Sequence, residues 1–229
     1  METAKKTVVV VGASRGIGAA VTQHFVEAGH RVFSVSRGAA VAGEWIQADI
    51  SAPDGIATIK AAIGAQPLDA LLFMGGVWED NAFTEAYDFF NSSDSETRFV
   101  LSVNTIAPIE ITRAVADNLA QGHNPRAIYI GALTGFDNCA SPEVANTASK
   151  FGLRGAVQAL RLALRSKNIG VTVINPGNVA TEEVMLDIAE GRFPPQTPIP
   201  MSDLIVSIEW VLSLSPHVDV PDLNLHQRS

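Results

Sequence analysis

Apolar and polar residues alternate with two different periods along this chain, and the pattern predicts a repeat of strands and helices. Short runs rich in β-branched residues predict buried strands at residues 8–11, 31–37, 45–50, 69–74, 127–131 and 171–174, with a last strand within 218–225. Apolar residues three or four apart predict helices over about 17–28, 54–63, 99–119, 146–166 and 202–214. Such alternation indicates right-handed βαβ units and a parallel sheet.

The repeat predicts a single-domain α/β fold, namely a doubly wound parallel sheet of the Rossmann type with helices on both faces. The chain has 229 residues, which fits one such domain, and we expect no linker within residues 1–229. Residues 79–96 lack periodicity, and Pro108 predicts a kink in the helix over 99–119. Residues 181–201 hold four prolines and predict a substrate lid or loop rather than a regular element.

Composition and charge exclude several classes of function. The net charge is −8 and no basic cluster exceeds the pair Lys5 and Lys6, so we expect neither nucleic acid nor an anionic membrane as a partner. The lone Cys139 excludes an intramolecular disulfide and fits a reducing compartment. We find no signal peptide and no apolar segment near the roughly 20 residues that span a bilayer, which predicts a cytoplasmic protein. The five histidines do not cluster with carboxylates, so no metal site is predicted.

The first predicted strand runs into a glycine-rich turn. Gly12, Gly16 and Gly18 stand at G-x-x-x-G-x-G spacing between four valines and an amphipathic helix. We expect the first glycine to allow a tight turn, the second a close approach to a ligand, and the third close packing of helix on strand. Because a helix N-terminus presents unpaired amides to an anion, the segment predicts a pyrophosphate site for a dinucleotide. A tight loop without a ligand is the alternative interpretation.

The end of the second predicted strand indicates which dinucleotide is bound. In such folds a carboxylate at this point accepts from the 2′-hydroxyl of NAD, whereas a basic residue accommodates the 2′-phosphate of NADP. This chain has Ser36 and Arg37 there, and Arg15 in the glycine turn can reach the same phosphate. We therefore expect NADP(H) as the cofactor. The alternative is that both arginines are solvated surface residues.

With these residues identified, the chain resembles the short-chain dehydrogenase/reductase family over about residues 7–215. The glycine turn looks like the family's cofactor turn, although Val11 replaces the usual threonine. Asp49 and Ile50 match the pair that meets the adenine ring, and residues 176–181 resemble the segment near the nicotinamide amide. The motifs and the resemblance together assign these residues to cofactor binding: Gly12, Ser14, Arg15, Gly16, Ile17, Gly18, Ser36, Arg37, Asp49, Ile50, Gly75, Gly76, Asn104, Lys150, Pro176, Gly177, Val179 and Thr181.

The proton-transfer residues that this resemblance implies are incomplete. The family places a tyrosine and a lysine four residues apart on one helix face, where the lysine lowers the pKa of the phenol, and adds a serine and an asparagine. Lys150 and Asn104 stand at matching positions, but Asn146 occupies the tyrosine position and Ala132 the serine position. An amide cannot donate a proton as a phenol does. We therefore expect Asn104, Asn146 and Lys150 to form a degenerate catalytic set.

Other side chains near the same predicted sheet edge are candidates for the missing groups. Thr134 can replace the lost hydroxyl as a hydrogen-bond donor, whereas Tyr129 is expected on the opposite face of its strand from Ala132. Further candidates, each of which also fits an ordinary loop or packing residue, are Trp78, Glu79, Asp80, Asp137, Cys139 and Ser141.

Three functions are compatible with this sequence. The resemblance implies an NADP(H)-dependent oxidoreductase that acts on a small carbonyl or alcohol substrate, with proton transfer weakened by about 10²- to 10⁴-fold. The alternatives are a non-redox enzyme and an NADP(H)-binding sensor or partner protein on the same fold. The resemblance also implies a homo-oligomer, a dimer or tetramer, in which the helices over 99–119 and 146–166 pair with their copies. A helix buried within one monomer is the alternative to that pairing.

Overall fold

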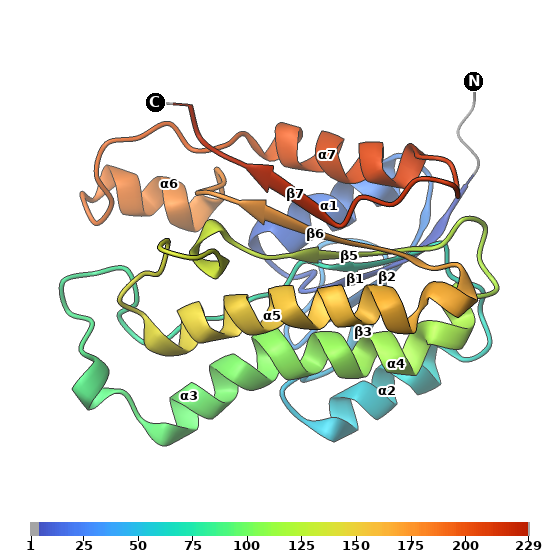
Figure 1. The fold of residues 1–229 in the computed structure, drawn as a ribbon, viewed down its shortest axis with the longest axis horizontal. Coiled ribbons are helices and arrows are strands. Elements are labelled where there is room, and N and C mark those ends of the chain that lie inside the picture. The colour runs from blue at the N-terminus through green and yellow to red at the C-terminus, as the bar shows by residue number, and fades with distance from the viewer. Residues whose placement is uncertain (1–4, 229) are drawn as a thin grey trace.

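The computed structural model describes residues 5–228, and its strands form one parallel sheet (Figure 1). The strand order is β3-β2-β1-β4-β5-β6-β7, and every neighbouring pair runs parallel. The strands are β1 (Thr7–Val11), β2 (Arg31–Ser36), β3 (Glu44–Gln47), β4 (Ala70–Phe73), β5 (Arg126–Ile130), β6 (Gly170–Pro176) and β7 (Asp222–Leu225). The predicted doubly wound parallel sheet is therefore confirmed.

Helices cover both faces of this sheet (Figure 1). One face carries α2 (Pro53–Ile63), α4 (Ala107–Leu119) and α5 (Val144–Ala163), and the other carries α1 (Gly16–Glu27) and α7 (Met201–Ser213). The four valines of β1 form a continuous apolar run because helices cover both faces of that strand. Val9 and Val11 belong to the core on the α2–α4–α5 face, whereas Val8 and Val10 belong to the core on the α1–α7 face.

The strand order reverses between β1 and β4, and two glycines meet at that point. Gly12 follows β1 with φ of +91°, and a Cβ on it would lie 2.5 Å from the Cα of Gly75, which follows β4. Any side chain on Gly12 would therefore collide with main chain. In doubly wound sheets the crevice at this reversal, outside the carboxyl ends of the strands, is where ligands bind.

The helix predicted over 99–119 begins earlier and is not continuous. It consists of α3 (Asp94–Leu101), a π-helical turn at Ser102–Ile106, and α4, with Pro108 in the first turn of α4. The backbone stays helical from α3 into α4, and the π-helical turn directly before Pro108 replaces the α-helical bonding pattern that the proline ring would disrupt. By length and composition the run Asp94–Leu119 would suffice to cross a membrane, which the sequence pattern did not lead us to expect. Half of it is buried in the protein, as is typical of a core helix.

Residues 181–201 are not all loop, so that part of the lid prediction is wrong. They contain α6 (Glu182–Ala189), and Thr181 caps it by accepting a hydrogen bond from the Val184 amide at 3.3 Å. Two glutamates in its first turn also favour the helix, because carboxylates interact well with a helix N-terminus. The four prolines lie beyond α6, between residues 194 and 200. The prolines near the end of the segment led us to expect loop over all of residues 181–201, and this missed the short capped helix.

Candidate functional site

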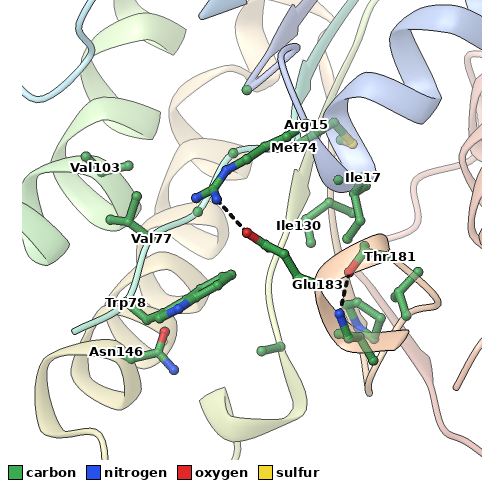
Figure 2. A pocket seen from close by; sticks show the side chains of 18 of the residues that line it. Arg15, Ile17, Met74, Val77, Trp78, Val103, Ile130, Asn146, Thr181 and Glu183 are labelled. Atoms are coloured by element: carbon green, nitrogen blue, oxygen red, sulfur yellow. Dashed lines mark hydrogen bonds and ion pairs between the residues drawn. The ribbon is translucent and has the colours of Figure 1, made fainter. Parts of the chain in front are cut away.

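A cavity of about 480 Å³ opens at the carboxyl ends of β1 and β4 (Figure 2). Its volume is in the range of small-molecule sites. Most of the residues assigned to cofactor binding and catalysis from the sequence line it: Gly12, Ser14, Arg15, Gly16, Ile17, Ser36, Arg37, Asp49, Ile50, Gly75, Gly76, Asn146, Lys150, Pro176, Gly177, Val179 and Thr181. Gly18 and Asn104 are not among the lining residues.

The glycine turn has the geometry of a phosphate cradle. A Cβ on Gly18 would lie 2.0 Å from the carbonyl oxygen of Gly12, so α1 packs against the end of β1 more closely than any other residue allows. Gly16 has φ of +54°, and it and Ile17 begin α1 while lining the cavity. The N-terminus of a twelve-residue helix therefore opens toward the cavity. These features fit the pyrophosphate of a dinucleotide.

The end of the cavity beside β2 has groups suited to an adenosine. Asp49 accepts hydrogen bonds from the hydroxyl of Ser51 at 2.7 Å and from its amide at 2.9 Å, and these bonds lower the pKa of the Asp49 carboxyl. The guanidinium of Arg37 lies 5.5 Å from the ring centroid of Phe99. The hydroxyl of Ser36 donates to the carbonyl oxygen of Gly38. The residue directly after β2 is thus the basic Arg37 and not a carboxylate.

Arg15 makes an ion pair that sequence spacing could not reveal. Its guanidinium donates to the Glu183 carboxylate of α6 at 2.5 Å, across 168 residues of sequence. Figure 2 shows this pair between the glycine turn and the end of the cavity where Trp78 and Asn146 lie. Arg15 and Arg37 therefore have different partners in this structure, Glu183 and Phe99.

Asn104 lies close to Lys150, which lines the inner end of the cavity. A Cβ on Gly76 would lie 3.6 Å from Lys150 Nζ and 3.8 Å from Asn104 Oδ1. The Asn104 amide accepts from the Val77 N–H at 2.9 Å and donates to the Val77 carbonyl at 2.7 Å and to Ser149 Oγ at 2.9 Å. Asn104 thus fixes the chain after β4 to α5. Burial lowers the pKa of Lys150 to about 8.

Asn146 and Ala132 both line the cavity, which brings the two substituted positions together. Thr134 lines it as well. Tyr129 points into the core on the other face of β5, as predicted, where its hydroxyl lies 2.5 Å from Thr112 Oγ1. Burial raises the pKa of the Tyr129 phenol, so this group cannot replace the missing acid. No phenol therefore stands in the lining.

Glu79 is buried and serves α5 rather than the cavity. Its carboxylate accepts hydrogen bonds from the main-chain amides of Ala145 at 2.6 Å and Asn146 at 3.1 Å. It therefore satisfies free N–H groups in the first turn of α5. Four further candidates from the sequence lie outside the lining: Asp80, Asp137, Cys139 and Ser141. Within the described part of the chain, no three His, Cys, Asp or Glu side chains are grouped so as to hold a metal ion.

Three aromatic side chains line the outer part of the cavity, two from the segment after β4 and one from the segment after α6. The rings of Trp78 and Phe83 meet edge to face at 5.9 Å, and those of Phe83 and Phe193 at 6.2 Å. Only Trp78 was a candidate from the sequence, because the other two lie in irregular segments without periodicity.

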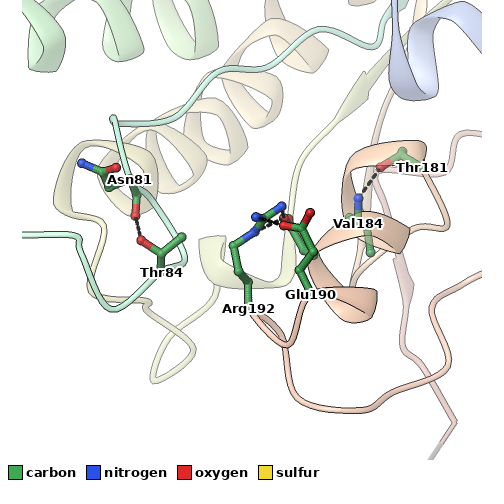
Figure 3. A network of polar contacts seen from close by, with 7 residues as sticks. Asn81, Thr84, Thr181, Val184, Glu190 and Arg192 are labelled. Carbon is green, nitrogen blue, oxygen red and sulfur yellow. Dashed lines mark hydrogen bonds and ion pairs between the residues drawn. The ribbon is translucent and has the colours of Figure 1, made fainter.

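Figure 3 shows polar contacts in the two segments that carry Phe83 and Phe193. Asn81 accepts from Thr84 Oγ1, and Arg192 forms ion pairs with Asp187 and Glu190 at the end of α6.

A sequence model of the short chain dehydrogenase family matches residues 6–189, which is most of the chain. The chain belongs to the short-chain dehydrogenase family. The resemblance found in its motifs is confirmed, and the protein is thereby a member of an oxidoreductase family.

Relatives of this short-chain dehydrogenase differ in what they bind. A cyclic-di-GMP-binding biofilm dispersal mediator protein of Escherichia coli K12 is 28% identical over 184 residues, which cover 77% of this chain and 74% of that protein. The structure of ElxO with NADP bound aligns with a TM-score of 0.82 at 16% identity and covers 97% of each chain. A 3-oxoacyl-[acyl-carrier protein] reductase from Brucella melitensis with bound NAD aligns with a TM-score of 0.79 at 19% identity, covering 98% of this chain and 91% of that chain. The two structures show the shared fold, in proteins that hold NADP or NAD.

Proposed function

We propose that this short-chain dehydrogenase is an NADP(H)-dependent oxidoreductase that acts on a small carbonyl or alcohol substrate. The observation that carries the proposal is one continuous cavity that runs from the glycine turn to Lys150 and Asn146. The bound dinucleotide would supply or accept hydride. The glycine turn and the N-terminus of α1 would hold its pyrophosphate, and Asp49 and Ile50 its adenine. Pro176, Gly177, Val179 and Thr181 would line its nicotinamide end, with Lys150 beside them.

The preference for NADP(H) over NAD(H) rests on the end of β2. Arg37 is free to swing from Phe99 toward a phosphate, and no carboxylate stands there to bind a ribose 2′-hydroxyl. Arg15 would join it after release from Glu183. We therefore expect the affinity for NADPH to exceed that for NADH, and replacement of Arg37 by serine to reduce the difference.

We infer that proton transfer in this chain differs from that in family members with a tyrosine at the position of Asn146 and a serine at the position of Ala132. Asn146 and Ala132 leave no phenol and no serine hydroxyl at the two substituted positions, although Lys150 lines the cavity and Asn104 lies near it. We infer weak reduction of simple ketones, with proton delivery from water. The cyclic-di-GMP-binding relative makes a binding protein the second candidate, since binding requires no proton donor.

Titration of the purified protein with NADPH and with NADH, followed by tryptophan fluorescence, tests the site because Trp78 lines the cavity. We expect saturable quenching, with tighter binding of NADPH. If neither dinucleotide binds, both the oxidoreductase and the NADP(H) sensor are excluded. If NADPH binds but is never oxidised with any carbonyl compound, the binding protein remains.

The double variant Asn146→Tyr with Ala132→Ser tests the assignment of the two substituted positions. Both side chains line the cavity, and Lys150 lies one turn along α5 from position 146. We expect turnover of a simple ketone such as cyclohexanone to rise by about 10²-fold or more, because a phenol beside a lysine supplies the missing proton. The measurement is NADPH absorbance. A variant that folds, binds NADPH and shows no gain contradicts the assignment.

We further propose that the protein is cytoplasmic and forms a homo-oligomer, with a small molecule as its substrate. The net charge of −8 offers no attraction for nucleic acid or an anionic membrane.

A further inference from the structure

Three side-chain amides meet beside the cavity, and each comes from a different segment of the chain. Asn178 follows β6, Gln196 lies between α6 and α7, and Gln227 follows β7. Gln227 Oε1 accepts from the Asn178 main-chain N–H at 3.2 Å, and Gln227 Nε2 donates to Gln196 Oε1 at 2.6 Å. The Asn178 side chain donates to the same oxygen of Gln196 at 2.9 Å. Gln227 thus connects the C-terminal tail to two other segments of the site.

Asn178 belongs to a wall segment, residues 177–181, which lines the cavity between its two ends. A Cβ on Gly177 would lie 3.5 Å from Leu133 Cδ1, just after β5, and a Cβ on Gly16 of the glycine turn would lie 3.8 Å from Thr181 Cγ2. The wall segment therefore runs from the end of β5 to the glycine turn. In the proposed function the adenosine half of the dinucleotide extends from that turn toward β2. The half that extends along the wall segment is therefore the nicotinamide half.

Main-chain hydrogen bonds hold the wall segment on two sides. The Gly177 N–H donates to the Leu225 carbonyl oxygen at 2.9 Å, and the Ile199 N–H donates to the Asn178 carbonyl oxygen at 2.8 Å. Gln227 accepts from the N–H of Asn178, which lies between these two contacts. The fit is close, since a Cβ on Gly177 would lie 2.7 Å from Gln227 Oε1. Gln227 therefore fixes the orientation of the peptide that joins Gly177 to Asn178.

The hydrophobic cores do not depend on Gln227. Within residues 5–228, Leu225 is the last residue that packs against either core, and Gln227 lies two residues beyond it. Gln227 itself lines the cavity, and its hydrogen bonds go to residues of the wall segment and of the proline-rich segment before α7. We therefore expect loss of this amide to change the cavity and to leave the thermal midpoint of unfolding unchanged.

We propose that Gln227 is a positioning residue that holds the peptide between Gly177 and Asn178 in place beside the nicotinamide half of the dinucleotide. This inference rests on the proposed function, which places the dinucleotide in the cavity. Gln227 acts through the wall segment, because a peptide that is already fixed loses less conformational freedom when the ligand binds. The C-terminal tail thereby contributes to the affinity for one half of the cofactor and not for the other.

Two ligands that differ only in the nicotinamide ring test this role: NADPH and 2′-phospho-ADP-ribose, which lacks the ring. Isothermal titration calorimetry measures the affinity for each. We expect Gln227→Ala to weaken NADPH binding by about five- to tenfold, the effect of losing one or two hydrogen bonds that order the site. The affinity for 2′-phospho-ADP-ribose should stay as in the wild type. The control is His226→Ala at the neighbouring exposed position of the tail, which should leave both affinities unchanged.

A second variant separates positioning from direct contact with the ligand. Gln196 is not among the lining residues, but its side-chain oxygen accepts from both Gln227 and Asn178. Gln196→Leu therefore loosens Gln227 without removing a group that lines the cavity. We expect it to weaken NADPH binding by about two- to fivefold and to leave 2′-phospho-ADP-ribose binding unchanged. If Gln196→Leu has no effect while Gln227→Ala has a large one, Gln227 contacts the ligand directly and the positioning role is overturned.

The outcomes separate this inference from the function on which it rests. If the wild type does not bind both ligands, the placement of the dinucleotide in the proposed function is wrong. If the wild type binds both, and Gln227→Ala weakens the two equally or weakens neither, the positioning role is wrong while the proposed function stands.

Discussion

Asn146 decides the chemistry of the cavity at the scale of a single residue. Its main-chain amide is held by Glu79 and its carbonyl oxygen accepts from Ser149 Oγ, so the backbone is fixed while the side-chain amide stays unpaired toward the cavity. A group held in this way is ready to bind a ligand at little entropic cost. A tyrosine in the same place would donate a proton, whereas asparagine donates only hydrogen bonds.

Replacing Asn146 by leucine should leave the thermal midpoint of unfolding unchanged or slightly raised. An unpartnered buried amide contributes no hydrogen bond, so its loss removes a desolvation penalty rather than an interaction. Thermal denaturation followed by circular dichroism measures the effect. A large fall in the midpoint would show that the amide has a structural partner.

Lys150 should make the binding of anions in the cavity depend on pH. Burial disfavours its charged form and lowers its pKa to about 8, so the ammonium is lost as pH rises through that value. We expect the affinity for a small anionic probe, 4-nitrophenolate, to fall above pH 8, at pH values where the probe is already ionised. The Lys150→Arg variant, which stays charged, should bind the phenolate without this fall.

Lys150 also affects stability, and the sign follows from the same shift. In the unfolded chain lysine keeps its proton to higher pH, so the stability of the wild type should rise as pH increases above 8. Lys150→Met should therefore be more stable than wild type at pH 7, with an advantage that shrinks at alkaline pH. Urea unfolding at several pH values measures it. A constant difference across pH would contradict the lowered pKa.

At the scale of elements, α6 joins the lid segment to the glycine turn. Thr181 caps the helix, and Glu183 in its first turn holds Arg15. The pair is exposed and therefore weak, but it occupies a guanidinium that we propose binds the 2′-phosphate of NADPH. We expect Glu183→Gln to strengthen NADPH binding by about two- to fivefold, the size of such an exposed pair.

The control for this prediction is the neighbouring exposed Glu182→Gln, which removes the same charge without releasing Arg15. Binding of NADPH by both variants is followed by tryptophan fluorescence. Equal effects of the two variants would mean that net charge, and not the ion pair, controls affinity.

Glu79 should matter for the stability of α5. Its buried carboxylate satisfies the amides of Ala145 and Asn146, so Glu79→Leu leaves them unpaired inside the protein. We expect a loss of about 1–3 kcal/mol in the free energy of unfolding. Urea denaturation measures it, with the exposed Glu85→Leu as the control. A loss no greater than that of the control would contradict the stabilisation of α5 by Glu79.

The elements that the sequence predicted well are those set by local pattern. The valines of β1, the spacing of Gly12 and Gly18, and the opposite orientation of Tyr129 follow from periodicity and backbone sterics. The contacts that were missed span long distances in sequence. The pairing of Arg15 with Glu183 and the hydrogen bonds from Glu79 to α5 depend on the folded sheet, which brings those segments to one edge.

At the scale of the whole molecule, apolar side chains remain exposed on the outer helical layer. The inward side of α5 is buried in the core through Leu153 and Val157. On the outer side, Leu162 of α5 is 69% exposed, and Ile106, directly before α4, is 47% exposed. We expect these helices to pack against a second copy. Leu162→Glu should shift the protein from dimer or tetramer toward monomer in light scattering. A wild type that is monomeric at all concentrations would contradict this expectation.

A crystal structure of the protein soaked with NADPH shows where a dinucleotide lies and so tests the assignment of this cavity to the cofactor. We expect the pyrophosphate against the amides of Gly16 and Ile17, the 2′-phosphate at Arg37, and the nicotinamide beside Lys150 and Asn146. A structure at saturating NADPH with no dinucleotide in this cavity, or with one bound elsewhere, would contradict it.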